Sequence, residues 1–211
     1  MLTLFGSTGS GSAAVEAALE LCSLPYRVVR ASTWEPDSDR AALLAANPLG
    51  QIPTLWLEDG SVLTESAAIL IHLGLMHPQA RLLPEGASQR AQALRGLVYI
   101  AANCYSAIGL IDYPERYCEG GDEAQHTRMR AGARARLHAC WSSFADQFHR
   151  EPFLSGEQPG ALDLLAMVVS KWSGARAHLQ AERPAFHALL ARIEAHPAVA
   201  PVVARHWPPR P

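Results

Sequence analysis

The sequence contains few charged residues, and this shortage excludes several classes of protein. Charged side chains make up 18% of the 211 residues, below the ~25% typical of soluble domains. Because 49% of the residues are hydrophobic, the chain lacks the combination of low hydrophobicity and high charge that keeps a protein disordered. The 18 basic and 20 acidic side chains give a net charge of −2, so no overall positive field attracts nucleic acid.

Long hydrophobic runs and clustered cysteines are absent as well. No stretch approaches the ~18 consecutive apolar residues of a membrane span, and the segment Met1–Gly6 has neither the basic start nor the apolar run of a signal peptide. The four cysteines lie far apart, without a C-x-x-C pair or paired histidines, which argues against a metal site or a dithiol centre. We therefore expect a cytoplasmic protein without a metal, whose cysteines are reduced and mostly packed.

The first third of the chain alternates between strands and helices. Short apolar or β-branched runs predict strands at 2–5, 26–30, 52–57 and 62–63, and apolar helical patterns predict helices at 13–24, 40–46 and 67–76. The Asp59-Gly60 turn should pair the last two strands as a hairpin. The resulting order is β-α-β-α-β-β-α, an α/β domain over residues 1–77.

The rest of the sequence is almost wholly helical. Residues 78–88 contain two prolines and a glycine and are expected to form a linker. Helices are predicted at 89–111, 126–149, 161–178, 184–195 and 198–206, with an apolar stripe along 126–149 that suits a bundle core. The second domain, residues 89–211, should therefore be all-helical.

A proline opens the third predicted strand, in the segment Asn47–Leu55 (NPLGQIPTL). Pro53 cannot donate a ladder hydrogen bond at that position. Either it is a trans proline at a strand start, or the Ile52–Pro53 bond is cis and lies in a tight turn. The cis form would turn the backbone N–H and C=O of Ile52 outward, where a peptide-like ligand could pair with them as a strand would.

The Glu65-Ser66 pair follows a strand and starts a helix. Free N–H groups in a first helical turn favour an anion near Ser66, and Glu65 supplies a negative charge for an ammonium. Such a pair suits an amino-acid head group, although taken alone it is better explained by ordinary helix capping.

Small residues fill the loop between the first strand and the first helix. Ser7, Thr8, Ser10 and Ser12 precede a helix N-terminus, and helix N-termini stabilise anions, including thiolates. A hydroxyl here could donate to a ligand thiolate, and the intervening glycines permit close approach. A phosphate-binding loop is the alternative, but no Lys-Ser/Thr follows. Glu16, inside the helix, is expected to be solvated.

Together these segments resemble the cytosolic glutathione S-transferase family over nearly the whole chain. Asn47–Leu55 and Leu63–Ile69 are similar to the cis-proline strand and the γ-glutamyl-binding Glu-Ser pair of that family. The first seven elements resemble its thioredoxin-like domain and the remainder its helical domain. Phe153–Asp163 looks like the start of the buried helix in domain two, and Ile193–Val199 is similar to the family's ending.

The resemblance implies glutathione as cosubstrate, with no metal, in a site formed by the two motifs. Ile52 would hold the cysteinyl backbone, and Glu65 and Ser66 would bind the γ-glutamyl ammonium and carboxylate. The implied cofactor-binding residues are Gln51, Ile52, Pro53, Glu65 and Ser66.

A serine of the first loop would then stabilise the thiolate. Ser10 is our first choice because bacterial members often place a catalytic cysteine or serine there, and Ser7 and Ser12 compete with it. The loop contains no tyrosine, no cysteine and no Ser-Ser-Cys motif, which disfavours the tyrosine-type and cysteine-type classes and the maleylacetoacetate isomerase group. Gly160 replaces the usual Ser or Thr cap before the buried Asp163, which we expect to be structural.

The resemblance also implies an acceptor-substrate pocket between the domains. Its candidate residues are Tyr99, Asn103, Tyr105, Tyr113 and Trp172, and Tyr105 stands roughly where certain bacterial members put a polar group beside the sulfur. For each aromatic residue, simple core packing is at least as good an explanation. The expected function is transfer of glutathione to an electrophilic, mostly apolar small molecule by a homodimer. The alternatives are a non-catalytic binding or regulatory module, or a glutathione-dependent peroxidase, reductase or isomerase.

Overall fold

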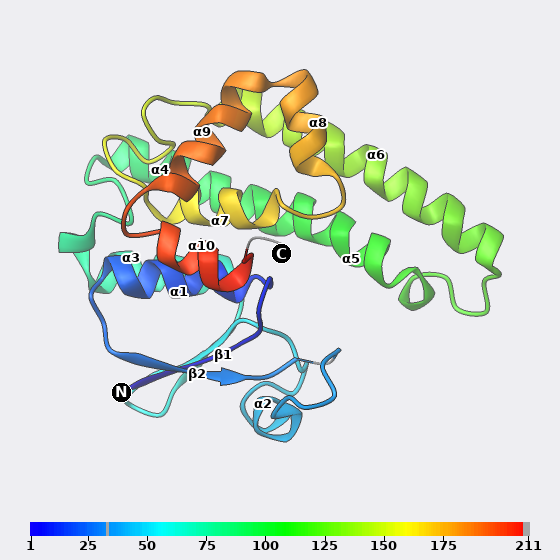
Figure 1. The fold of residues 1–211 in the computed structure, drawn as a ribbon, viewed down its shortest axis with the longest axis horizontal. Coiled ribbons are helices and arrows are strands. Elements are labelled where there is room, and N and C mark those ends of the chain that lie inside the picture. The colour runs from blue at the N-terminus through cyan, green and yellow to red at the C-terminus, as the bar shows by residue number, and fades with distance from the viewer. Residues whose placement is uncertain (33, 209–211) are drawn as a thin grey trace.

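A four-stranded mixed sheet forms the base of the molecule in the computed structural model, which describes residues 1–32 and 34–208 (Figure 1). Its strand order is β2-β1-β3-β4. β1 and β2 run parallel, whereas β3 is antiparallel to both β1 and β4. A parallel pair needs a crossover connection, which the first helix provides. The strands are β1 (Leu2–Gly6), β2 (Tyr26–Arg30), β3 (Thr54–Trp56) and β4 (Val62–Leu63).

Helices cover both faces of this sheet (Figure 1). α1 (Ser12–Leu21) and α3 (Ser66–Met76) lie together on the face toward the helical domain, and α2 (Arg40–Ala46) covers the opposite face. Successive strand residues point to opposite faces, so Leu4 enters the main core while Phe5 packs with Leu43 of α2. The predicted thioredoxin-like order of elements is confirmed.

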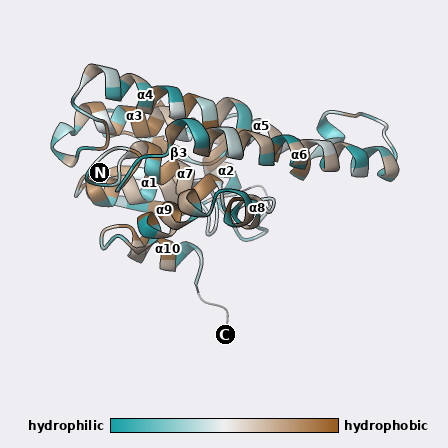
Figure 2. Cartoon of the chain, turned by 90° about the horizontal axis from the view of Figure 1, so that it is seen from above, coloured by the Kyte–Doolittle hydropathy of each residue, from teal (hydrophilic) through white to brown (hydrophobic). Residues whose placement is uncertain are grey.

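The remaining helices stack above α1 and α3. α7 (Ala161–Val169) is buried along its whole length and contacts α1, α3, α4 and α9 (Figure 2). α5 and α6 pack against each other and extend as an arm beyond the rest of the molecule (Figure 1). The other elements are η1 (Pro78–Ala80), α4 (Ala87–Tyr99), the π-helical η2 (Ile100–Tyr105), α5 (Ser106–Asp112), η3 (Pro114–Arg116), α6 (Glu123–Phe148), α8 (Ala175–Glu182), α9 (Pro184–Ala195) and α10 (Ala200–His206).

Two sequence predictions are wrong in this helical part. The single helix expected at 161–178 is two helices, because Ser173 (φ 54°) and Gly174 (φ 81°) take left-handed conformations that a right-handed helix cannot continue through. α4 begins at Ala87, inside the predicted linker, because Gly86 provides an extended N-cap. Cys22, Cys104 and Cys140 are buried free thiols and Cys118 is a half-buried one, in agreement with the expected packed cysteines.

One helical stretch, 87–112, is long and apolar enough to cross a membrane by length and composition. Its α4 portion contacts α3, α6 and α7, so it behaves as a core helix of the bundle.

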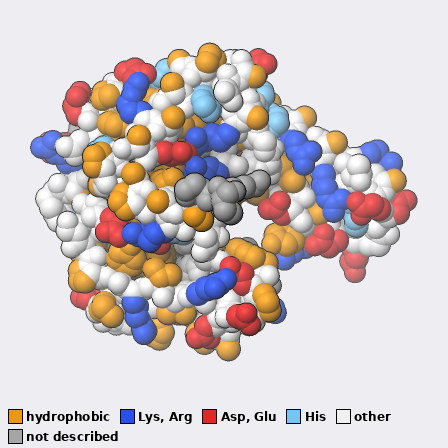
Figure 3. Space-filling model, viewed as in Figure 1, with side chains coloured by type: hydrophobic (Ala, Val, Ile, Leu, Met, Phe, Trp, Pro, Cys, Tyr) orange, Lys and Arg blue, Asp and Glu red, His pale blue; other side chains and the backbone are white. Residues whose placement is uncertain are grey.

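On the face shown in Figure 3, basic and acidic side chains are interspersed.

Candidate active site

The turn before β3 is held by buried side chains. The Ile52–Pro53 peptide bond is cis, which is the second of the two alternatives that the sequence left open. Asn47 Nδ2 donates to the Gln51 carbonyl (3.0 Å) and to Thr54 Oγ1 (3.2 Å), and the Thr54 hydroxyl donates to the same carbonyl (2.8 Å). Asn47 and Thr54 are both buried, so these bonds fix the backbone on either side of Pro53.

Glu65 stands at the N-cap of α3 in a strained backbone conformation. Its φ is +64°, which is uncommon for a residue with a side chain and costs about 1–3 kcal/mol. Its carboxylate is exposed and forms no ion pair within the described residues. Ser66, the first residue of α3, is buried. Strain of this kind persists where function requires it, so the pair is a candidate binding site.

The serines of the first loop are mostly bonded to one another. The Ser10 hydroxyl donates to the Ser7 carbonyl (2.7 Å) and accepts from the Ser12 amide (3.2 Å), while the Ser10 and Ser12 hydroxyls are paired at 2.8 Å. The Ser7 hydroxyl is buried without a hydrogen-bond partner in the described chain. Ser10 would therefore have to rotate away from the Ser7 carbonyl before donating to a ligand.

Tyr105 brings an unpaired hydroxyl from the helical domain to the N-terminus of α1. A methyl group added to Gly11 would stand 2.5 Å from the Tyr105 oxygen and 3.5 Å from Pro53 Cδ, so all three residues meet at the N-terminus of α1. The buried Tyr105 oxygen has no hydrogen-bond partner among the described residues. The Gly11 amide also donates no hydrogen bond within the part of the chain that the structure describes, so the Tyr105 hydroxyl and this amide are two free donors there.

Burial keeps Tyr105 protonated. It raises the pKa of this phenol to about 12, and the Glu65 charge adds to the rise. The Ser66 hydroxyl is close enough to oppose the shift without reaching hydrogen-bonding geometry. At neutral pH Tyr105 is therefore a neutral donor, and its position links the loop, Pro53 and the Glu65-Ser66 pair.

Two tryptophans extend this group. The Trp172 ring lies 5.9 Å from that of Tyr105. Trp207 Nε1 would be 3.6 Å from a methyl group on Gly9, and the Lys171 ammonium stands 4.6 Å from the Trp207 ring centroid. Trp207 was missed from the sequence because no spacing connects the C-terminal segment to the first loop.

Three candidate pocket residues lie elsewhere. The Tyr99 hydroxyl donates to the Cys140 carbonyl (3.1 Å), and its ring packs near Phe144 and Phe148. Asn103 donates to the Tyr99 carbonyl (3.1 Å), and Tyr113 is covered by the Arg116 guanidinium. No hydrogen bond or ring contact in the described residues connects these three to Gly11.

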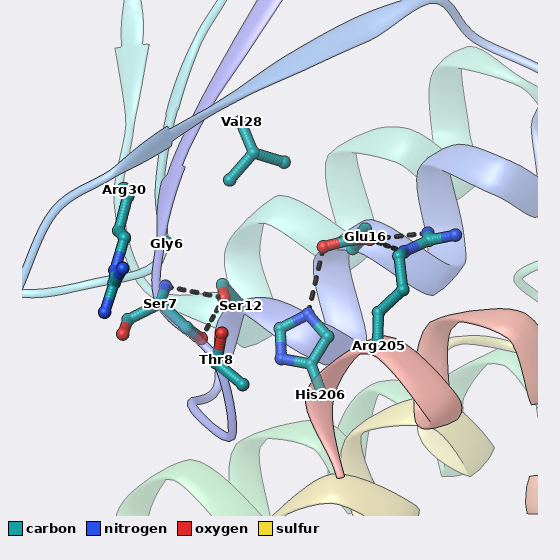
Figure 4. Close-up of a pocket in the computed structure, with 9 residues that line it drawn as sticks. All are labelled: Gly6, Ser7, Thr8, Ser12, Glu16, Val28, Arg30, Arg205 and His206. Atoms are coloured by element: carbon teal, nitrogen blue, oxygen red, sulfur yellow. Dashed lines mark hydrogen bonds and ion pairs between the residues drawn. The ribbon is translucent and has the colours of Figure 1, made fainter. Parts of the chain in front are cut away.

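Glu16 corrects another expectation, since it is buried rather than solvated. Its Oε2 accepts from His206 Nε2 (3.0 Å) and its Oε1 accepts from Arg205 Nε (2.8 Å), both on α10 (Figure 4). A cavity of about 270 Å³ lies beside these groups, lined also by Ser7 and Ser12. Burial alone would raise the pKa of Glu16, but the bonds from His206 and Arg205 outweigh it and lower the pKa. Glu16 is thus an ionised anchor for α10.

Asp163 has the structural role expected of it. Its carboxylate accepts from the amides of Leu154 (2.7 Å), Ser155 (2.9 Å) and Gly160 (3.0 Å) at the start of α7. These bonds satisfy donors that the helix itself leaves free.

Several known proteins are similar to this chain in sequence and in fold. Residues 12–75 match the family description "Glutathione S-transferase, N-terminal domain". The chain is 32% identical over 173 residues to the "Uncharacterized GST-like protein YncG" of Escherichia coli K12, covering 82% of each. A crystal structure of a glutathione transferase homologue from Sulfitobacter with bound glutathione superimposes with a TM-score of 0.82, 29% identity and 96% coverage of both chains. A glutathione S-transferase from Methylobacterium radiotolerans, in complex with glutathione sulfonate, gives 0.76 and 26% over 96% of this chain and 94% of that one. The chain therefore belongs to the glutathione S-transferase family.

Proposed function

We propose that this protein is a glutathione transferase that activates the thiol of glutathione at the N-terminus of α1. The observation that carries the proposal is the meeting of the unpaired Tyr105 hydroxyl with Gly11 and Pro53, next to Ser66. Two similar structures contain glutathione or its sulfonate, which supports the same ligand here.

Glutathione would bind along the start of β3. Its cysteinyl backbone pairs with the main chain of Ile52 beside Pro53, and Gln51 adds a contact. The exposed Glu65 carboxylate accepts the γ-glutamyl ammonium, and the N-terminus of α3 at Ser66 binds its carboxylate. The oppositely charged groups of one amino-acid head are thus recognised by adjacent residues.

The reaction requires only that the sulfur be ionised and held near its target. The thiol releases its proton to solvent, because the helix N-terminus, the Gly11 amide and the Tyr105 hydroxyl all favour the thiolate. The sulfur then forms a bond to the electrophilic carbon of the acceptor, and that carbon loses its leaving group with the bonding pair. Ser10, Ser7 and Ser12 are the alternative hydroxyl donors.

The acceptor would occupy the space between the domain of residues 1–77 and that of 89–211. Tyr105, Trp172 and Trp207 offer aromatic walls there, which suits a mostly apolar electrophile.

We further propose a cytoplasmic homodimer. Leu75, Met76 and Val98 are exposed large apolar residues on the contacting helices α3 and α4, and such surfaces commonly pair.

A thermal-shift titration with reduced and oxidised glutathione tests the proposal. For a dissociation constant of ~0.1 mM, ~10 mM ligand adds ~2.7 kcal/mol of stability, or roughly 5–10 °C in a chain of this size. A saturable rise supports glutathione binding, and its absence contradicts the proposal. Halonitrobenzene, hydroperoxide, disulfide and maleyl substrates then separate transferase from peroxidase, reductase and isomerase activity, and binding without any turnover would favour a regulatory module.

A further inference from the structure

The last helix of the chain reaches back to the loop that precedes α1 (Figures 1 and 4). The Gly9 amide donates a hydrogen bond to His206 Nδ1 at 3.1 Å, across 197 residues of sequence. Gly9 has a left-handed φ of +71°, and its amide makes no other hydrogen bond among the described residues. The histidine therefore supplies the one side-chain anchor of this peptide unit within the described structure.

The opposite edge of the same imidazole is bonded to Glu16. His206 Nε2 lies 3.0 Å from Glu16 Oε2, and only 7% of His206 and 6% of Glu16 are exposed. A neutral imidazole has one donor and one acceptor nitrogen. Because the Gly9 amide can only donate and the Glu16 carboxylate can only accept, we assign the proton to Nε2 and the lone pair to Nδ1.

Arg205 holds Glu16 in place for this role. Its Nε donates to Glu16 Oε1 (2.8 Å), and its Nη2 donates to Glu20 (2.9 Å) one turn further along α1. Glu16 is therefore fixed from two sides and in turn fixes the rotation of the His206 ring. The loop that precedes α1, α1 itself and α10 are therefore connected by one network of hydrogen bonds.

We propose that His206 is a positioning residue: through Gly9 it holds the backbone of residues 8–10 so that the Gly11 amide and the N-terminus of α1 face the reacting sulfur. This inference rests on the proposed function, since it assigns the sulfur to glutathione. In this proposal His206 acts through Gly9 and not by direct contact with the sulfur. It sets the geometry of the donors, and a misplacement of ~1 Å in such a group can cost ~100-fold in rate.

Two substitutions of His206 test its two hydrogen bonds one at a time. In His206→Asn the side-chain oxygen stands where Nδ1 stood and can still accept from Gly9, but the bond to Glu16 is lost. In His206→Gln the amide nitrogen can still donate to Glu16, but the acceptor for Gly9 is lost. Val202→Ala, which removes buried side-chain atoms from the same helix, is the control for simple loosening of α10.

Each protein is measured in two ways. Hydrogen exchange of residues 7–12 reports loop anchoring without any ligand. The pH midpoint of thiolate formation on bound glutathione, with kcat and KM, reports the effect on chemistry. We expect faster exchange, a midpoint raised by about one unit and a ~10-fold lower kcat in His206→Gln, with KM for glutathione little changed. His206→Asn and Val202→Ala should stay within about two-fold of the parent kcat.

The outcomes are distinguishable from failure of the proposed function. If the parent protein binds no glutathione, the proposed function fails and the catalytic part of this inference fails with it. If the parent ionises glutathione but His206→Gln matches it in exchange and midpoint, the inference alone is overturned. Equal loss in the Asn, Gln and Val202→Ala variants also overturns it, because it would indicate general loosening of α10.

Discussion

The Tyr105 hydroxyl lies against the α carbon of Gly11, so close that a methyl group on that carbon would stand 2.5 Å from the phenolic oxygen. The two residues come from different domains, and no other described polar group is bonded to this oxygen. Gly11 has an ordinary helical φ of −60°. The glycine is therefore needed for close approach and not for backbone freedom.

Substitution of Gly11 tests this contact. Gly11→Ala should push the Tyr105 ring away and lower kcat/KM by about 10-fold or more, because a donor displaced by ~1 Å loses most of its effect. The expected change in thermal stability is small, since alanine fits the backbone conformation. Gly132→Ala, on an open face of α6, is the matched control, and a Gly11→Ala enzyme with parental activity would contradict the account.

Removal of the Tyr105 hydroxyl should separate activity from stability. A buried hydroxyl without a partner is costly, so Tyr105→Phe should leave the unfolding temperature unchanged or raise it. If the hydroxyl donates to the thiolate, kcat/KM should fall by ~10–1000-fold. Ser10→Ala should have the smaller effect on rate but should destabilise the loop, where Ser10 bonds to Ser7 and Ser12. The reverse order would identify Ser10 as the donor.

Glu65 carries both backbone strain and the proposed ammonium-binding charge. Glu65→Gly relieves the φ of +64° and should hold or raise the unfolding temperature, while glutathione affinity falls. Glu65→Gln keeps the strain and removes only the charge. We expect both variants to raise the dissociation constant by ~10–100-fold, in the range lost when one partner of a charged hydrogen bond is removed. Calorimetric titration showing parental affinity in Glu65→Gln would exclude the charge from binding.

The Glu16 anchor predicts a pH dependence of folding stability. Its folded pKa lies below the ordinary value of 4.5, because the bonds from His206 and Arg205 outweigh burial. Its contribution is therefore fully present above about pH 4.5 and is lost as the pH falls through the folded pKa. Urea unfolding of the parent and of Glu16→Gln should differ by ~1.5–3 kcal/mol at pH 7, and this difference should shrink as the pH falls below the ordinary value of 4.5. A difference that does not shrink on acidification would contradict the ionised anchor.

Much of the N-terminal domain could be predicted because its signals are local. The strands at 26–30 and 62–63 and the helix at 40–46 begin and end where composition and turn residues placed them. The helix boundary at 170–174 was missed because Ser173 takes a left-handed φ in a segment whose composition is helical. Tertiary packing therefore ends the helix at this boundary, although the local composition favours a continuous helix.

In the candidate site, too, the residues marked by local sequence signals could be predicted, whereas those brought together by tertiary packing could not. Pro53 and the Glu65-Ser66 pair stand out within short segments, so sequence reasoning reached them. The Glu16–His206 pair joins positions 190 residues apart, and Trp207 approaches Gly9 only after α10 folds onto α1. No spacing in a single sequence encodes such contacts, because they depend on how the two domains pack.

Ionisation of the glutathione thiol is the step on which the proposed function depends. Difference absorbance of the thiolate, followed against pH with glutathione saturating the parent protein, tests it most directly. We expect a titration midpoint at least about one unit below the ~8.5 of an ordinary cysteine thiol, and a midpoint nearer that value in Tyr105→Phe. A bound thiol that titrates at the same pH as free glutathione would contradict the claim.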